Sequence, residues 1–195
     1  MECWSLDPHQ TALLLAGSDG TRQAARDRTI GAICLDTGLR RREAVALRVG
    51  DLDTGTWTVS VGMGVTRRVI RLGRHSRLAL EQLLDTDRGD SSPLLVSRAG
   101  VAVTARVIHE QLSRAGELAG LGGWVTCRHT RRTYLQVIAG THPLPIVMRL
   151  MGHAGDGRHR PASITEALEA QFDDAWVSPL DTLMSKAREP VLRAA

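Results

Sequence analysis

Arginine and histidine side chains gather in three short segments of this 195-residue chain, at residues 37–43, 125–134 and 150–153. Lys186 is the only lysine among the 25 basic residues, so the other 24 are arginine. The planar guanidinium of arginine presents paired donors that suit a phosphate group. A net charge of +4 and an isoelectric point near 9.6 indicate a polyanionic partner, although GC-rich codon usage would give the same excess of arginine.

The groups that usually complete a catalytic or metal site are scarce. The chain has one tyrosine, Tyr134. It has no Ser-His-Asp spacing, P-loop or dinucleotide-binding glycine motif, and its histidines lack a zinc-ligand spacing, so we expect neither a cofactor nor a metal. Cys3, Cys34 and Cys127 are too widely spaced for a disulfide framework or a metal pair, which indicates a reducing cytoplasm. No apolar run reaches the length of a membrane span.

Local patterns predict a mainly α-helical domain with one small antiparallel β-sheet, an α+β architecture. Alternating side chains at residues 57–61 and 67–72, joined by Gly62, Met63 and Gly64, predict a β-hairpin. A further short strand is expected at residues 93–97, and a loop at residues 154–161. Helices are expected at about residues 8–15, 22–36, 41–47, 76–84, 104–119, 128–139, 145–151, 163–171 and 179–193.

Four runs resemble the tyrosine recombinase (phage integrase) family: residues 36–53, 61–73, 125–134 and 150–153. The resemblance spans about residues 6–170 and implies the fold of that family's catalytic domain, which we place at residues 1–170. The family's N-terminal core-binding domain, which closes a clamp around DNA, has no counterpart. Residues 171–195 are expected to form a helical tail that docks either on its own chain or on a neighbouring protomer. Phe172, Trp176 and Leu183 supply its apolar contacts.

The resemblance also implies a chemistry. In the family, two arginines and a histidine hold the scissile DNA phosphate, a hairpin lysine protonates the leaving oxygen, and a tyrosine attacks phosphorus. By position, Arg40, Arg131 and His153 are the phosphate-holding residues. Met63 stands in the place of the lysine and has no proton to give. Leu168 lies near the place of the tyrosine, so the nucleophile is absent.

The second arginine segment fits the family in two registers. One sets Arg128 in the family's histidine position and Arg131 as its arginine, and makes Tyr134 a core aromatic. The other uses His129 and Arg132 as a literal His-x-x-Arg. More flanking residues agree with the first register. Because successive helical residues point about 100° apart, only one of the two arginines faces the site.

Two further arginines, Arg67 and Arg68, follow the hairpin turn. The sequence predicts that they lie on an exposed strand, where they either contact DNA or are merely solvated. A guanidinium stays protonated and is a poor general acid, so neither replaces the missing lysine.

The leading hypothesis is a catalytically inactive recombinase-like protein that keeps an arginine and histidine phosphate pocket and binds duplex DNA. We expect a role in, or an origin from, DNA recombination and integration, in a bacterial cytoplasm and associated with the nucleoid. Two alternatives are open. One is a recruited enzyme or small-anion-binding protein that uses the same pocket. The other is an interaction partner of an active recombinase, or self-association through the tail.

Overall fold

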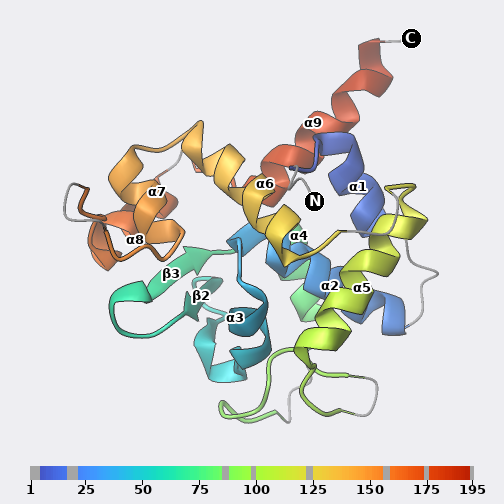
Figure 1. The fold of residues 1–195 in the computed structure, drawn as a ribbon, viewed down its shortest axis with the longest axis horizontal. Coiled ribbons are helices and arrows are strands. Elements are labelled where there is room, and N and C mark those ends of the chain that lie inside the picture. The colour runs from blue at the N-terminus through green and yellow to red at the C-terminus, as the bar shows by residue number, and fades with distance from the viewer. Residues whose placement is uncertain are drawn as a thin grey trace.

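The computed structural model describes residues 5–16, 22–84, 88–97, 100–121, 125–155, 159–173 and 176–193 (Figure 1). Its helices are α1 (Pro8–Ala16), α2 (Arg22–Thr37), α3 (Arg41–Ala46), α4 (Arg74–Glu81), α5 (Ala105–Leu118), α6 (Cys127–Ala139), α7 (Leu144–Leu150), α8 (Ile164–Phe172) and α9 (Pro179–Arg193). Strands β1 (Leu52–Asp53), β2 (Thr58–Val61) and β3 (Arg68–Arg71) form an antiparallel sheet in that order. The predicted fold class is confirmed. Cys3 and residues 156–158 of the predicted loop lie outside the described residues.

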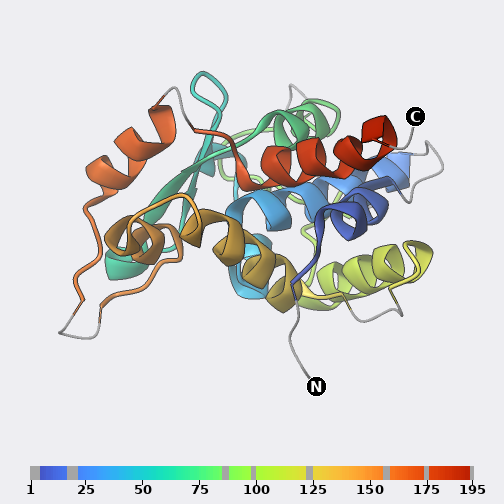
Figure 2. The ribbon, with the colours of Figure 1, turned by 90° about the horizontal axis from the view of Figure 1, so that it is seen from above.

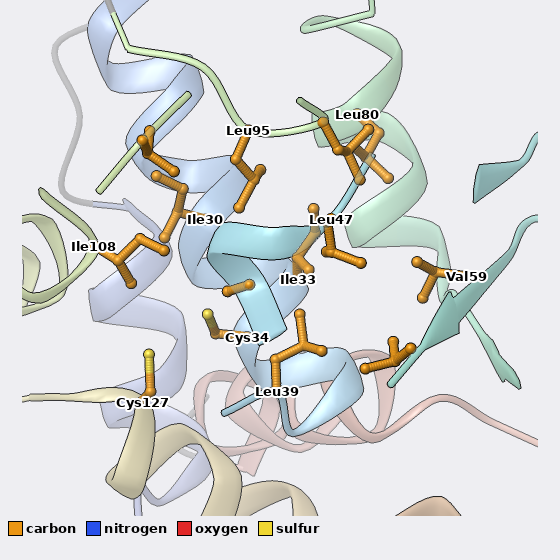
Figure 3. Packing of buried hydrophobic residues seen from close by; sticks show 14 of the residues in the cluster. Ile30, Ile33, Cys34, Leu39, Leu47, Val59, Leu80, Leu95, Ile108 and Cys127 are labelled. Carbon is orange, nitrogen blue, oxygen red and sulfur yellow. The ribbon is translucent and has the colours of Figure 1, made fainter. Parts of the chain in front are cut away.

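Helix α2 is the centre of the helical part, because α1, α4, α5, α6 and α9 all pack against it. Ile30 and Ile33 belong to the main apolar cluster, with Leu80 of α4 and Ile108 of α5 (Figure 3). Leu35 faces a second cluster, formed with residues of α1 and α9. A helix that is apolar on several sides is stable only when other elements enclose it.

The predicted hairpin is present, with Val59 of β2 opposite Ile70 of β3. Gly62 has φ +79°, and a Cβ there would lie 2.8 Å from the carbonyl oxygen of Thr66, so this turn requires glycine. Strand β1 was not predicted, because two residues are too few to show an alternating pattern. The strand predicted at residues 93–97 is wrong: Pro93 and other residues there make only isolated bridges, outside any named strand.

Helices α6, α7 and α8 share a third apolar cluster around Tyr134, which includes Leu150 and Ala167. Helix α8 lies along β3, and the buried side chain of Gln171 joins them. Its Oε1 atom accepts a hydrogen bond from the Arg71 amide at 2.7 Å, and its Nε2 atom donates to the Val69 carbonyl at 3.0 Å. These bonds satisfy backbone groups at the edge of the sheet and fix α8 there.

The described part of the tail packs on its own chain. Helix α9 lies against α1 (Figure 2). Leu180 is fully buried in the second apolar cluster. The Asp181 carboxylate accepts a hydrogen bond from the Arg74 amide at 2.6 Å, and the buried Asp36 carboxylate accepts one from the Gly73 amide at 2.6 Å. Burial raises the pKa of Asp36 to about 6. None of the described helices is both long and apolar enough to cross a membrane.

Candidate functional site

Arg131 on α6 is held by two backbone carbonyls from distant segments. Its Nη1 atom donates to the carbonyl of Gly38 at 2.7 Å, and its Nη2 atom donates to the carbonyl of Met151 at 2.5 Å. Gly38 lies two residues before Arg40, and Met151 lies two residues before His153. One guanidinium therefore joins the three arginine- and histidine-rich segments at a single place.

The first turn of α6 determines which side chains point toward this place. Thr126 caps the helix: its Oγ1 atom accepts from the Arg128 amide at 3.2 Å, and its own amide donates to Nδ1 of His129 at 3.1 Å. His129 is buried in this cap, whereas Arg128 and Arg132 are exposed. Burial, and then the charge of Arg128, lower the pKa of His129. Of the three arginines in this segment, only Arg131 contacts Gly38 and Met151 within the described residues.

The turn between α2 and α3 positions Arg40. Gly38 has φ +58°, and a Cβ there would lie 2.5 Å from a ring carbon of Tyr134, so only glycine fits. The backbone amide of Arg40 donates to Oε2 of Glu43 at 2.7 Å. The Nη1 atom of the Arg40 side chain lies 3.3 Å from Oε1 of the same carboxylate. The Arg40 side chain is 33% exposed and is therefore partly accessible to solvent.

Glu43 pairs with a second arginine, Arg68, through two hydrogen bonds of 3.1 and 2.9 Å. Burial alone would raise the pKa of Glu43, but the hydrogen bonds and charge of Arg68, together with Arg40, outweigh it and lower the pKa to about 2. The Arg68 side chain is fully buried. The prediction that Arg68 lies on an exposed strand is therefore corrected, because its guanidinium faces Glu43 inside the fold. Arg67, the preceding residue, is exposed.

His153 follows the end of α7, where the backbone approaches the Arg68 guanidinium closely. Gly152 has φ +64°, and a Cβ there would lie 2.8 Å from Nη1 of Arg68. His153 is exposed to solvent as a whole residue. Its ring is nevertheless partly desolvated, and this, followed by the charges of Arg131, Arg40 and Arg68, lowers its pKa. His153 and these three arginines are thus close enough to interact electrostatically.

Positive charge accumulates at this place. Burial, and then the charges of Arg40 and Arg68, lower the pKa of Arg131 to about 10, so its guanidinium stays protonated at neutral pH. Glu43 is the one carboxylate among the described groups that acts on Arg131. The arrangement favours an added anion, because an anion would stabilise every cationic group present.

Met63 and Leu168, which the sequence predicts to stand in the places of the family's lysine and tyrosine, lie on different elements. Met63 is in the hairpin turn and is 86% exposed. Leu168 lies on α8 and is partly buried, next to the fully packed Ala167. Tyr134 is completely buried, and its hydroxyl has no hydrogen-bond partner among the described residues. Burial raises the pKa of this hydroxyl well above its usual range.

A cleft of about 640 Å³ opens beside Arg40, between α3 and β2. Arg42, Arg48 and Met63 also line it. The described residues contain no group of three or more His, Cys, Asp or Glu side chains that could hold a metal ion.

The sequence did not indicate the Glu43–Arg68 pair or the two carbonyl acceptors of Arg131. A weak signal for Glu43 was present, because a glutamate three residues after a helix N-cap often bonds back to the cap amide. Nothing local identifies Arg68 as its partner, since the two residues are 25 positions apart.

Residues 5–158 match the family model described as "Phage integrase family". The chain is 32% identical over 139 residues to tyrosine recombinase XerC of Salmonella typhi, covering 67% of this chain and 45% of that protein. It is 29% identical over 167 residues to tyrosine recombinase XerD of Mycobacterium tuberculosis (strain ATCC 25618 / H37Rv), covering 77% of this chain and 53% of that protein. The chain therefore spans about half the length of the curated relatives it matches.

Solved structures give the same fold. The crystal structure of XerA recombinase superposes with a TM-score of 0.67 at 21% identity, over 90% of this chain and 68% of that one. The Tn1549 transposon integrase in complex with transposon right end DNA gives 0.66 at 17% identity, over 89% and 66%. The lambda integrase catalytic core gives 0.60 at 16% identity, over 81% and 96%.

Proposed function

The chain belongs to the phage integrase family, and on that premise we propose that it is a recombination-related protein that grips a backbone phosphate of duplex DNA without cleaving it. The phosphate would lie against Arg40, Arg131 and His153. Arg128 and Arg67, both exposed, would contact phosphates farther along the strand.

The main support for the proposal is that the Arg131 guanidinium donates hydrogen bonds to the carbonyls of both Gly38 and Met151. Gly38 lies two residues before Arg40, and Met151 lies two residues before His153, which are the other two proposed phosphate-binding residues. A guanidinium that is already fixed loses little conformational freedom when it meets a phosphate. The same backbone contacts would keep the three ligand groups in a constant arrangement.

The absence of cleavage follows from the chemistry of three side chains. Met63 cannot protonate a leaving oxygen, and Leu168 cannot attack phosphorus. Tyr134 is fully buried, and the pKa of its hydroxyl is raised by that burial. A phosphodiester held here would therefore lack both the tyrosine nucleophile and the lysine acid that the resemblance to the family implies.

Fluorescence anisotropy with a labelled duplex tests the proposal. We expect binding that weakens as salt is added, and a roughly tenfold or greater loss of affinity on Arg40→Ala, since one charge-assisted contact is removed. Arg106→Ala is the matched control, because Arg106 is an exposed arginine paired only with Glu110 among the described residues. Absence of duplex binding, or equal losses in the two variants, would disprove the phosphate pocket.

A second candidate is a small-anion-binding protein, and the cleft beside Arg40 favours it. Its volume of about 640 Å³ fits a small phosphorylated molecule. Three arginines line it, Arg40, Arg42 and Arg48, and they outnumber its two carboxylates, Glu43 and Asp51. Isothermal titration with inorganic phosphate and with a mononucleotide distinguishes the two. Micromolar binding of either small ligand, with no measurable affinity for duplex, would favour this candidate over the first.

A further inference from the structure

Two thiols meet across the contact between α2 and α6. Cys34 of α2 is completely buried, and Cys127, the first residue of α6, is 7% exposed. Both side chains belong to the main apolar cluster, and each thiol shifts the pKa of the other. Figure 3 shows both thiols in the space between the two helices. The proposed phosphate pocket uses neither of them.

This thiol pair lies one helical turn from the anchor of Arg131. Cys127 precedes Arg131 by four residues on α6, so the two share a face of that helix. The Cys34 carbonyl accepts from the Gly38 amide at 3.1 Å, and the Gly38 carbonyl accepts from Arg131 at 2.7 Å. A covalent bond between the thiols would therefore act directly on the segment that holds the arginine.

The two sulfur atoms differ in reactivity. Cys127 lies at the N-terminal end of a 13-residue helix, where the helix dipole favours a thiolate. The neighbouring Cys34 thiol lowers the pKa of Cys127, and although burial opposes this, the charge of Arg41 adds to it. The neighbouring Cys127 thiol and burial raise the pKa of Cys34. Cys127 is thus the attacking sulfur and Cys34 the resolving one.

We propose that Cys34 and Cys127 form an oxidation site at which a peroxide produces a disulfide between α2 and α6. The Cys127 thiolate attacks one peroxide oxygen, the O–O bond breaks, and the leaving oxygen departs as water after taking up a proton. The resulting sulfenic acid is attacked by the Cys34 sulfur. The S–O bond then breaks and a second water leaves with the Cys34 proton. Two thiols lose two electrons in total, and these electrons reduce the peroxide.

The disulfide restricts the movement of α6 relative to α2 at the turn that precedes Arg131. In the reduced protein, that turn is held only by non-covalent contacts. The proposed DNA pocket is preorganised by the cross-link, so we expect the oxidised protein to bind duplex roughly threefold more tightly. This last step rests on the proposed function, whereas the formation of the disulfide does not.

Peptide mapping after mild hydrogen peroxide treatment tests the disulfide. We expect a linked peptide containing Cys34 and Cys127, reversed by dithiothreitol, in the wild type and in Cys3→Ser. The linked peptide should be missing in Cys127→Ser, which replaces a slightly exposed thiol with a similar hydroxyl. Oxidised wild-type protein that keeps two free thiols at these positions, or that links Cys3 instead, would overturn the proposal. If Cys127→Ser does not fold, the wild-type and Cys3→Ser maps alone decide between these outcomes.

Duplex binding by reduced and oxidised Cys3→Ser protein then separates the two claims. Tighter binding after oxidation supports the coupling between the disulfide and the pocket. Equal affinity in both forms, with the linked peptide present, overturns the coupling but not the oxidation site. Absence of duplex binding in both forms disproves the proposed function and the coupling with it, and leaves the disulfide result unaffected.

Discussion

At the scale of single residues, Arg131 is a charged side chain held in one position by backbone contacts. An arginine on a helix surface samples many rotamers, but two carbonyl acceptors at 2.7 and 2.5 Å keep this one in place. Both acceptors are backbone atoms, so their positions follow from the turn at Gly38 and the end of α7. The surrounding fold, and not a neighbouring side chain, sets the direction of the guanidinium.

His153 makes the proposed binding depend on pH. In the free protein, burial and the charges of three arginines lower its pKa, whereas a bound phosphate would raise it. Binding therefore takes up a proton, so the extra affinity is fully present below the free-state pKa and is lost as pH rises through the bound-state pKa. We expect a roughly two- to tenfold stronger affinity at pH 5 than at pH 8, measured by anisotropy. The same ratio in His153→Ala would contradict this role.

The types of the pocket residues could be predicted from the sequence, but their contacts could not. The positions of Arg40, Arg131 and His153 within their segments indicated a common site. The acceptors on Arg131 could not be inferred, because backbone carbonyls carry no sequence signature. The two registers of residues 128–132 could not be separated by pattern alone, since both place an arginine within one helical turn.

At the scale of elements, the Glu43–Arg68 pair joins α3 to β3. Arg68→Met removes both of its hydrogen bonds to Glu43 and leaves that carboxylate with Arg40 as its remaining ion-pair partner, so we expect a reduction in the free energy of unfolding of about 2–3 kcal/mol. The double variant with Glu43→Leu should recover much of that loss, because both charges are then gone. Urea denaturation measures both values. A loss below about 1 kcal/mol in the single variant would show that the pair is not structurally important.

The same pair has a pH dependence of defined sign. The pKa of Glu43 is about 2 in the folded protein, below the usual value of about 4.3 in an unfolded chain. Its contribution to stability is therefore fully present above about pH 4.3 and is lost as pH falls through about 2. Acid titration of the wild type against the double variant should show a difference that narrows over this range. A constant difference would contradict the assignment.

Helix α9 stabilises the domain through Leu180, which is fully buried between α1 and α2 residues. Leu180→Ala should reduce the free energy of unfolding by about 2–5 kcal/mol, because it leaves a cavity. Val177→Ala is the control, since Val177 is 57% exposed and precedes the helix, and it should change stability by less than about 0.5 kcal/mol. Equal effects in thermal denaturation would mean that α9 is not docked on its own chain in solution.

Most elements could be predicted from the sequence, because helical periodicity and turn glycines are local signals. The buried position of Arg68 could not be predicted. Strand β3 alternates, so Arg68 and Ile70 point to the same, buried face. The sequence predicts an arginine at this position to be exposed, because nothing nearby shows that Glu43, 25 positions earlier, is its partner.

At the scale of the whole molecule, the domain has the fold of the family, and we propose that it does not cleave DNA. If Leu168 and Met63 occupy the places of the family's tyrosine and lysine, as the sequence predicts, no covalent adduct between the protein and a nicked suicide duplex should be seen on a denaturing gel. A stable protein–DNA band in the wild type would contradict this expectation. Its disappearance in Tyr134→Phe would then identify Tyr134 as the nucleophile.

The most direct test of the central claim is the salt dependence of duplex binding by the wild type and Arg40→Ala. The logarithm of the association constant should fall linearly with the logarithm of salt concentration, with a slope of about −0.9 for each phosphate contacted. Loss of one phosphate contact predicts a slope for Arg40→Ala that is shallower by about one. Equal slopes for the two proteins, or no salt dependence in either, would contradict the proposal that Arg40 binds a DNA phosphate.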